Sequence, residues 1–415
     1  MKLSYKYHPK LTRKESEIIE ELSFHTTKLY NTVNYNCRQD KFVNYVTMNT
    51  LYSNNWHKQF MHSHTYQQCL KLIEQNWKSF FAGVKDYAIH PEKYEAKPQP
   101  PKFKNSKNKN EVIFTNFAIR VMNNTIMLSL SKAMQDKFKV KSLNFNLSDK
   151  IKSLINLEGI QQIKIAWNKS SKKWYLNIIY EKEQVNITKH FDNIMSIDLG
   201  LDNLATITFE NNIKSYLIDG KWIKCKNSYY NKSIAKFTSI KMKQDKEPEY
   251  FKRSKRINKL QEKRNNTVKD YIHKASRKII DLAISNKCHT IIIGDFSGVK
   301  QNNTIKSFVQ IPQQQLVDKV KYKADLVGIK IVLQEESYTS GCSALDLDII
   351  GKKYYDKKRR VKRGLFVSNK GIKINADING SINIMRKYLK CIPKSLKEIM
   401  DNGFVDNPLR LRVAY

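Results

Sequence analysis

Two aspartates stand in surroundings that suit metal-dependent chemistry. Asp198 follows the short apolar run 194–197, and Gly200 two residues later permits a tight reversal and the close approach of a phosphate backbone. Asp377 lies within Asn375-Ala376-Asp377-Ile378-Asn379-Gly380, where a helix is expected to begin. Either aspartate alone is more typical of an ordinary turn or helix cap. Together, two such carboxylates can hold a hard divalent cation such as Mg²⁺, if the fold brings them to one place.

The elements that would position these aspartates follow the order of an α/β domain. Short apolar strands are expected first, then a long basic helical stretch, and then strands that alternate with helices. Three adjacent strands followed by helix, strand, helix, strand and helix form an RNase H-like order with a buried parallel sheet. The expected elements are strands at 194–197, 204–209 and 213–218, helices within 222–288, a strand at 290–293, a helix at about 312–327, a strand at 329–333 and a helix from about Asp377.

The first 189 residues have a different pattern, which predicts a β-rich lobe that carries a helical insertion. Residues 2–8 alternate like a strand, and Thr12 with Glu15 forms a possible capping box at the start of a helical region. Several β-branched and aromatic segments follow within 111–186. We therefore expect a β-barrel whose helical insertion covers about residues 12–105.

The charge of the chain favours a polyanionic partner. Lys and Arg number 75 against 38 Asp and Glu, which gives a formal net charge of +37. A globular protein of this charge repels itself unless a polyanion neutralises it, so nucleic acid is the leading partner. The alternative is a solvated, lysine-rich surface. The expected nucleic-acid contacts are Lys252, Arg253, Lys255, Arg256, Lys259, Arg264, Lys358, Arg359, Arg360 and Arg363.

Other features of the composition predict a cytoplasmic protein. No run approaches the roughly 18 apolar residues needed to span a bilayer. The start, Met1-Lys2-Leu3-Ser4-Tyr5-Lys6, has no apolar signal core. The six cysteines are scattered without paired spacing, as is typical of reduced thiols in a cytosolic protein.

The two aspartate motifs resemble those of TnpB proteins, which are encoded by insertion-sequence transposons. Ser196-Ile197-Asp198-Leu199-Gly200 resembles their first RuvC motif, and residues 375–380 resemble their third. The segments 308–312 and 336–340 also look like that family. The resemblance is firm over about residues 190–390 and weaker over 1–189.

This resemblance implies an RNA-guided DNA endonuclease in the prokaryotic cytosol or nucleoid. It predicts a wedge-like barrel lobe at 1–189, a RuvC nuclease domain at 190–390 and a short tail at 391–415. Guide RNA and target DNA are the implied partners, whereas the oligomeric state, monomer or dimer, stays open. Two Mg²⁺ ions, held in part by Asp198 and Asp377, would hydrolyse the phosphodiester.

The second RuvC motif departs from the family pattern. Family members place a glutamate where this chain has Gly294, at the end of the fourth strand. Asp295 is one residue later and should face away, because side chains alternate along a strand. We expect Glu335 or Glu336 from the end of the neighbouring strand to take the glutamate's place, with Asp295 third. The alternatives are an RNA-guided repressor without cleavage and a DNA-binding accessory factor of transposition.

A second departure concerns zinc. The family often carries two Cys-x-x-Cys pairs in the region that corresponds to about 341–374 here, whereas residues 341–376 hold only Cys342 and no histidine. A structural zinc site needs about four such ligands, so no zinc is expected. The basic cluster 357–363 in the same insert is expected to contact phosphates or to form a solvated loop.

Overall fold

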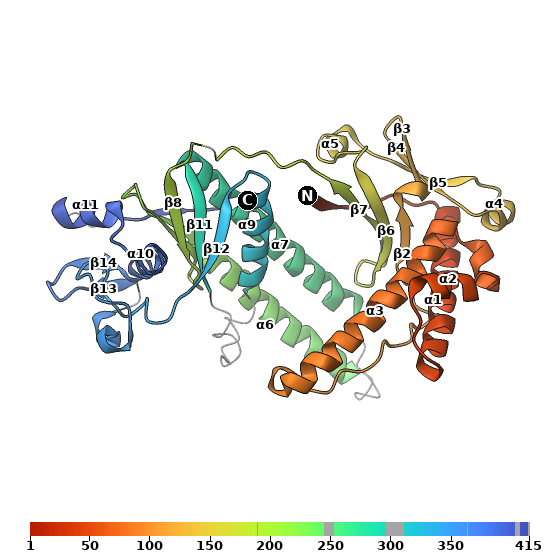
Figure 1. Ribbon diagram of the computed structural model, residues 1–415, viewed down its shortest axis with the longest axis horizontal. Coiled ribbons are helices and arrows are strands. Elements are labelled where there is room, and N and C mark those ends of the chain that lie inside the picture. The colour runs from red at the N-terminus through yellow and green to blue at the C-terminus, as the bar shows by residue number, and fades with distance from the viewer. Residues whose placement is uncertain (189, 245–252, 296–310, 363, 403–406, 414–415) are drawn as a thin grey trace. The chain divides into compact units, whose positions relative to one another are not determined.

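The computed structural model of the chain describes residues 1–188, 190–244, 253–295, 311–362, 364–402 and 407–413. Lys252, Arg363 and residues 308–310 of the family-like segment therefore lie outside the described residues. The chain forms two compact units, Met1–Lys182 and Glu183–Tyr415 (Figure 1).

The first unit combines helices with two antiparallel sheets. Its four-stranded sheet has the order β1-β7-β6-β2, and its three-stranded sheet has the order β3-β4-β5. The long helices α1 and α3 come between β1 and β2 in the chain. The elements are β1 (Lys2–Tyr7), α1 (Arg13–Gln39), α2 (Tyr45–Leu51), α3 (Ser63–Ile89), β2 (Val112–Thr115), β3 (Ile119–Met122), β4 (Thr125–Ser129), α4 (Lys132–Phe138), β5 (Ser142–Asn146), α5 (Asp149–Lys152), β6 (Ile160–Asn168) and β7 (Lys173–Glu181).

Helix α1 begins as its sequence predicts. The Thr12 side chain accepts a hydrogen bond from the Glu15 backbone N–H, and the Glu15 carboxylate accepts one from the Thr12 backbone N–H. This capping box satisfies two donors that the first helical turn leaves without partners. The buried side of α1 starts with Ile18, Ile19 and Leu22, which pack into the core of the first unit.

The second unit is built around a six-stranded sheet of order β12-β11-β8-β9-β10-β15. Its elements are β8 (Asn193–Asp198), β9 (Asn203–Phe209), β10 (Tyr216–Asp219), α6 (Lys221–Gln244), α7 (Lys255–Ser285), β11 (Cys288–Asp295), α9 (Gln313–Asp325), β12 (Lys330–Glu335), β13 (Leu365–Val367), β14 (Lys373–Asn375), α10 (Ala376–Leu389), α11 (Lys394–Asn402) and β15 (Leu409–Leu411).

The pairing of these strands confirms the RNase H-like prediction. Strands β8, β9 and β10 form an antiparallel meander, and β11 and β12 then add in parallel beyond β8. The parallel pairs need helical crossovers, which the helices between them in the chain provide. The wedge-like barrel expected for the first unit stays a prediction.

Helices cover both faces of the sheet, with α10 on one side and α7 and α9 on the other (Figure 1). Ile291 and Ile293 of β11 pack into the core formed with α7 and α9. Ile292 instead packs with Ile384 and Met385 of α10. The same alternation places Gly294 on the α10 face and Asp295 on the opposite face.

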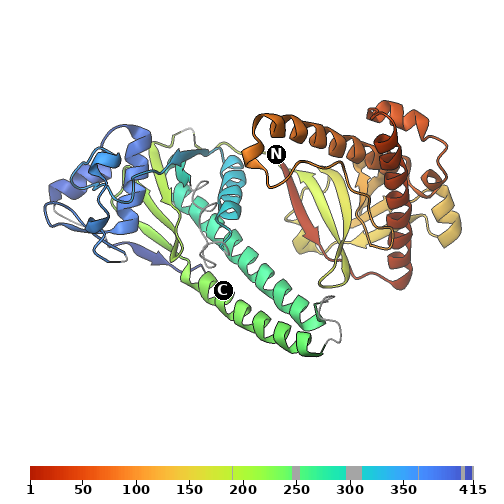
Figure 2. The ribbon, with the colours of Figure 1, turned by 90° about the horizontal axis from the view of Figure 1, so that it is seen from below.

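Two further features of the second unit complete its frame. Helices α6 and α7 pack side by side as a long pair (Figure 2). The C-terminal segment, predicted as a short tail at 391–415, contributes α11 and the edge strand β15, which pairs in parallel with β10. The strand β15 spans only three residues, too few for a periodic sequence pattern to predict it. Among the described residues, no helix is long and apolar enough to cross a membrane.

Candidate active site

The carboxyl ends of β8 and β12 border a cavity of about 450 Å³ in the second unit. Ligands of α/β proteins often bind outside this end of a sheet. Four carboxylates line the cavity: Asp198 ends β8, Glu336 follows β12, Asp377 lies in the first turn of α10, and Asp202, in the turn between β8 and β9, forms an ion pair with Lys224. Arg360 and Asn203 line it as well.

Asp377 is held in place by three neighbours, Asn375, Asn203 and Arg360. The Asn375 side chain caps α10 and accepts a hydrogen bond from the Asp377 backbone N–H at 2.9 Å. Asn203 donates to Asp377 Oδ2 at 2.7 Å, and Arg360 donates to Oδ1 at 2.9 Å. A carboxylate in the first turn of a helix is also favoured by the helix dipole. The aspartate is therefore a cap-region residue whose carboxylate is turned into the cavity.

Asp198 comes close to the same helix because Gly380 has no side chain. A Cβ at Gly380 would lie 2.8 Å from Asp198 Oδ2, too short for a normal contact. Burial, then the negative charges of Glu336 and Asp377, raise the pKa of Asp198 to about 8, against the opposing effect of Arg360. The raised pKa therefore reflects first the burial of the carboxyl and then the negative charges near it.

Glu336 occupies the space that Gly294 leaves open. A Cβ on Gly294 would collide with Glu336 Oε2 and would lie 2.9 Å from Ile384 Cδ1. The glutamate side chain therefore enters from the end of β12 into the position where a β11 side chain would begin. Burial, then the charges of Asp295 and Glu335, raise its pKa to about 7.

The neighbouring acids behave differently. Glu335 is exposed and forms an ion pair with Lys387, and it accepts a hydrogen bond from the Ser337 backbone at 2.6 Å. Lys387, then Ser337, lowers the pKa of Glu335 to about 2. Neither Glu335 nor Asp295 lines the cavity. Of the three candidate substitutes, only Glu336 shares the cavity with both aspartates.

The carboxylates do not converge on a single point in this arrangement. Within the described residues, no group of three or more His, Cys, Asp or Glu side chains is close enough to hold a metal ion. Arg360 and Asn203 occupy both oxygens of Asp377, which explains why its carboxylate is not free to join the others. The donor set nevertheless fits Mg²⁺, because Asp198, Glu336 and Asp377 all offer carboxylate oxygens, the ligand atoms that this hard cation prefers.

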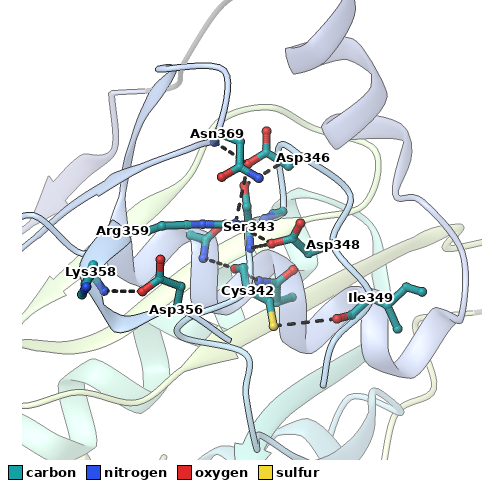
Figure 3. A network of polar contacts seen from close by, with 12 residues as sticks. Cys342, Ser343, Asp346, Asp348, Ile349, Asp356, Lys358, Arg359 and Asn369 are labelled. Carbon is teal, nitrogen blue, oxygen red and sulfur yellow. Dashed lines mark hydrogen bonds and ion pairs between the residues drawn. The ribbon is translucent and has the colours of Figure 1, made fainter. Parts of the chain in front are cut away.

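The insert before α10 is held by a polar network (Figure 3). Arg359 donates to Asp348 at 2.6 Å and lies 3.8 Å from Asp346. Asp348 also accepts from the Ser343 backbone, and two amides of α10, Asn379 and Asn383, donate to the Cys342 carbonyl at 2.8 Å. These bonds attach the insert directly to the helix that carries Asp377.

The basic residues that the sequence predicts as nucleic-acid contacts differ in burial and in their partners. Arg359 is only 17% exposed and belongs to the network, whereas Lys358 is exposed. Arg256 stacks over Phe237, and Arg264 donates to Asn227 at 2.8 Å. Phosphate contact stays a prediction for the described members of the set, which are Arg253, Lys255, Arg256, Lys259, Arg264, Lys358, Arg359 and Arg360.

Sequence reasoning did not identify Asn203 as part of this site. Its amide nitrogen binds Asp377, while its Oδ1 is buried without a hydrogen-bond partner among the described residues. The one signal available was its position at the start of the strand that returns beside Asp198. Arg360 was expected to contact phosphate, whereas its pairing with Asp377 depends on how the insert folds.

Comparisons with known proteins agree with this topology. The family described as "Probable transposase" matches residues 177–300, and the family described as "Cas12f1-like, TNB domain" matches residues 314–384. A TnpB-like protein, ORF457 of Acidianus two-tailed virus, is 23% identical over 419 aligned positions, which cover 90% of this chain and 84% of that protein.

Two Cas12f1 proteins extend the comparison. The CRISPR-associated endodeoxyribonuclease Cas12f1 of Sulfoacidibacillus thermotolerans is 28% identical over 233 residues, 54% of this chain. This chain matches only about half of that relative's length, 53%. The chain in a solved Cas12f1–sgRNA–target DNA complex has the same fold, with a TM-score of 0.61 at 16% identity over 90% of this chain and 83% of that one.

Proposed function

Because this chain belongs to the TnpB family, we propose that it is an RNA-guided DNA endonuclease that cleaves DNA by metal-dependent phosphodiester hydrolysis. The observation that carries the proposal is the shared cavity of Asp198, Glu336 and Asp377 at the carboxyl end of the sheet. The relatives' names support the same reaction, since they include endodeoxyribonucleases and a complex with guide RNA and target DNA.

The three carboxylates would hold the metal. Mg²⁺ bound there, two ions in our proposal, would supply an activated water and would neutralise the leaving oxygen. Asp198 and Glu336 have raised pKa values, so a divalent cation would favour their ionised forms. Asn203 would keep the Asp377 carboxylate oriented, and Arg360 would offer its charge to a phosphate once the carboxylate binds metal.

Guide RNA and target DNA are the proposed partners. Base pairing between them would supply sequence recognition, while the protein holds the heteroduplex through its backbone. The net charge of +37 supports this role.

The proposal is tested by cleavage of a plasmid that carries a guide-matched site. The chain, co-expressed with its guide RNA, should cut this plasmid with Mg²⁺ and not with EDTA. Asp198→Ala and Asp377→Ala should each abolish cutting while target binding persists. Absence of cutting by the wild-type chain, with guide RNA bound, would refute the endonuclease.

Gly294 and the partnered Asp377 carboxylate favour a second candidate, an RNA-guided DNA-binding protein without nuclease activity. This candidate predicts that the chain binds the target DNA but does not cleave it when Mg²⁺ is added. A third candidate, a DNA-binding accessory factor of transposition, predicts that no RNA co-purifies with the chain.

A further inference from the structure

Five basic side chains line the contact between α7 and α9, and none of them lines the carboxylate cavity. On α7, Lys269, His273 and Arg277 recur every four residues and therefore share one face. On α9, Lys319 and Lys323 have the same spacing. We call these five residues the α7–α9 basic cluster.

The two rows are in direct contact. Lys323 Nζ donates to the His273 carbonyl oxygen at 2.7 Å and to Ser276 Oγ at 2.8 Å. Burial, then the charges of Lys319, Lys323 and Lys269, lower the pKa of His273 to about 4, although Asp270 opposes them. The imidazole is therefore surrounded mainly by positive charge.

The lysines affect one another in the same way. Burial, then Arg277 and Lys319, lower the pKa of Lys323 to about 8, and burial with Lys269 lowers that of Lys319. Three acidic side chains lie nearby, Asp270, Asp281 and Asp318. Asp281 pairs with Arg277 of the cluster, whereas Asp270 and Asp318 each pair with a residue outside it. These pairs are Asp270 with Lys274 at 2.9 Å, Asp281 with Arg277 at 2.9 Å and Asp318 with Gln314 at 2.9 Å.

Like charges gathered on a folded surface cost stability, as do like-charge pairs four residues apart on a helix. A ligand of opposite charge would remove this cost. The α7 row spans about 12 Å from Lys269 to Arg277 at 1.5 Å per residue, which is longer than one phosphate group and suits an extended polyanion.

We propose that the α7–α9 basic cluster binds the phosphodiester backbone of a nucleic acid, with Lys269, Lys319 and Lys323 as phosphate contacts. This inference rests on the proposed function in one respect, the identity of the nucleic acid. The proposed function makes it the guide RNA or the DNA paired with that RNA. The cluster is distinct from the basic residues expected from the sequence at 252–264 and 358–363.

The test uses the full chain with Lys269→Gln and Lys319→Gln combined. Within the residues that the structure describes, neither lysine forms a hydrogen bond or an ion pair, so the change leaves the Lys323 bonds intact. The matched control combines Lys278→Gln and Lys330→Gln, which remove the same charge from exposed positions of α7 and β12.

Affinity is measured against salt concentration for single-stranded RNA, an RNA–DNA heteroduplex and a DNA duplex of equal length. Each lost phosphate contact should reduce the slope of log K against log salt by about 0.7–0.9, so the double variant should lose about 1.4–1.8 with its natural partner. The probe with the largest loss identifies the source of the backbone. The control should keep the wild-type slope.

Thermal unfolding without nucleic acid gives a second readout. The double variant should unfold at a higher temperature than the wild type, because two repelling charges are gone. The pKa of His273, followed by its ring NMR signals, should rise from about 4 when RNA binds, since phosphates offset the charges of Lys269, Lys319 and Lys323.

The outcomes separate this inference from the nuclease proposal. Equal salt slopes for the double variant and its control would overturn the inference, as would a lower unfolding temperature with unchanged affinity. If the wild-type chain cuts no DNA but the double variant still loses affinity for nucleic acid, the result would support the α7–α9 basic cluster. It would count only against the nuclease proposal.

Discussion

At the scale of single residues, the question is which carboxylate completes the site. Glu335 and Glu336 are adjacent and chemically identical, yet only Glu336 enters the cavity with Asp198 and Asp377. Gly294 makes this possible, because any side chain there would meet Glu336 Oε2. The two positions thus form a complementary pair, a small residue on β11 and a carboxylate from β12.

Glu336→Gln should reduce cleavage by at least two orders of magnitude, because the metal would lose a charged ligand. Glu335→Gln should keep nearly full activity, since Glu335 pairs with Lys387 on the surface. Plasmid cleavage with equal guide loading measures both. Full activity of the Glu336→Gln variant would contradict the relocated ligand.

Returning the carboxylate to position 294, where the TnpB family has its glutamate, also tests whether positions 294 and 336 are complementary. Gly294→Ala alone should lower cleavage, because its Cβ displaces Glu336. Gly294→Glu combined with Glu336→Gly should recover part of the lost activity, since a glutamate from β11 would then reach the same cavity. A double variant that is no better than Gly294→Ala would show that the two positions do not exchange.

The raised pKa values of Asp198 and Glu336 also predict how stability depends on pH. The folded-state pKa values of Asp198 and Glu336, about 8 and about 7, lie above the ordinary carboxyl values of about 4. The folded chain then holds protons that the unfolded chain has lost, so without divalent cations its stability should fall as pH rises from about 4 to about 8.

Thermal unfolding in EDTA between pH 5 and pH 8.5 measures this fall, and Asp198→Asn should make it shallower. Mg²⁺ should raise the unfolding temperature more at the upper end of this range than at the lower end, because binding needs ionised carboxylates. An equal Mg²⁺ effect across the range would argue against these groups as ligands.

At the scale of elements, helix α10 connects the site to the rest of the domain. Its first turn carries Asp377, its next turn carries Gly380 against Asp198, and Asn379 and Asn383 hold the insert. Ser381 bonds to Ser196 of β8 and to Thr208 of β9, which fixes the helix on the sheet. Because the insert is bonded to α10, the polar network of the insert helps to position Asp377 in the cavity.

Arg359→Met should destabilise this insert. The change leaves the carboxylates of Asp346 and Asp348, each 8% exposed, without their cation. Breaking a buried ion pair costs about 3 kcal/mol of unfolding free energy, measurable by denaturant titration. Lys358→Met, at an exposed neighbouring position, should change it by less than about 0.5 kcal/mol.

The same pair of variants separates two roles of the basic segment. If Arg359 contacted phosphate rather than supporting the fold, Arg359→Met would weaken RNA binding and leave the unfolding free energy unchanged. Proteolysis within 341–376 offers an independent check, since a loosened insert should be cut faster.

At the scale of the whole molecule, charge dominates. A net charge of +37 repels itself in the free chain and attracts polyanions. Salt should therefore act in opposite directions on the free and the bound protein, because screening relieves repulsion in one case and weakens attraction in the other.

Thermal unfolding against NaCl concentration tests this opposition. The free chain should unfold at a higher temperature as salt rises, whereas the stabilisation that RNA provides should shrink. The control is the same RNA after digestion to nucleotides, which should stabilise little. A free chain whose unfolding temperature falls with salt would contradict self-repulsion as the main term.

Sequence alone determined the features that depend on local pattern. Strand alternation and helix order predicted the RNase H-like domain, Thr12 and Glu15 predicted the start of α1, and composition predicted a polyanionic partner. Asp198 and Asp377 could be singled out because each sits beside an element that its own neighbours specify. These properties depend on residues close in sequence.

Tertiary structure decided everything that depends on contacts between distant segments. It placed Glu336 rather than Glu335 beside Gly294, because the turn after β12 directs one side chain inward. It paired Arg360 with Asp377, set Lys319 and Lys323 against the α7 row, and added β15 to the sheet edge. Such contacts arise from long-range packing, to which no local periodicity corresponds.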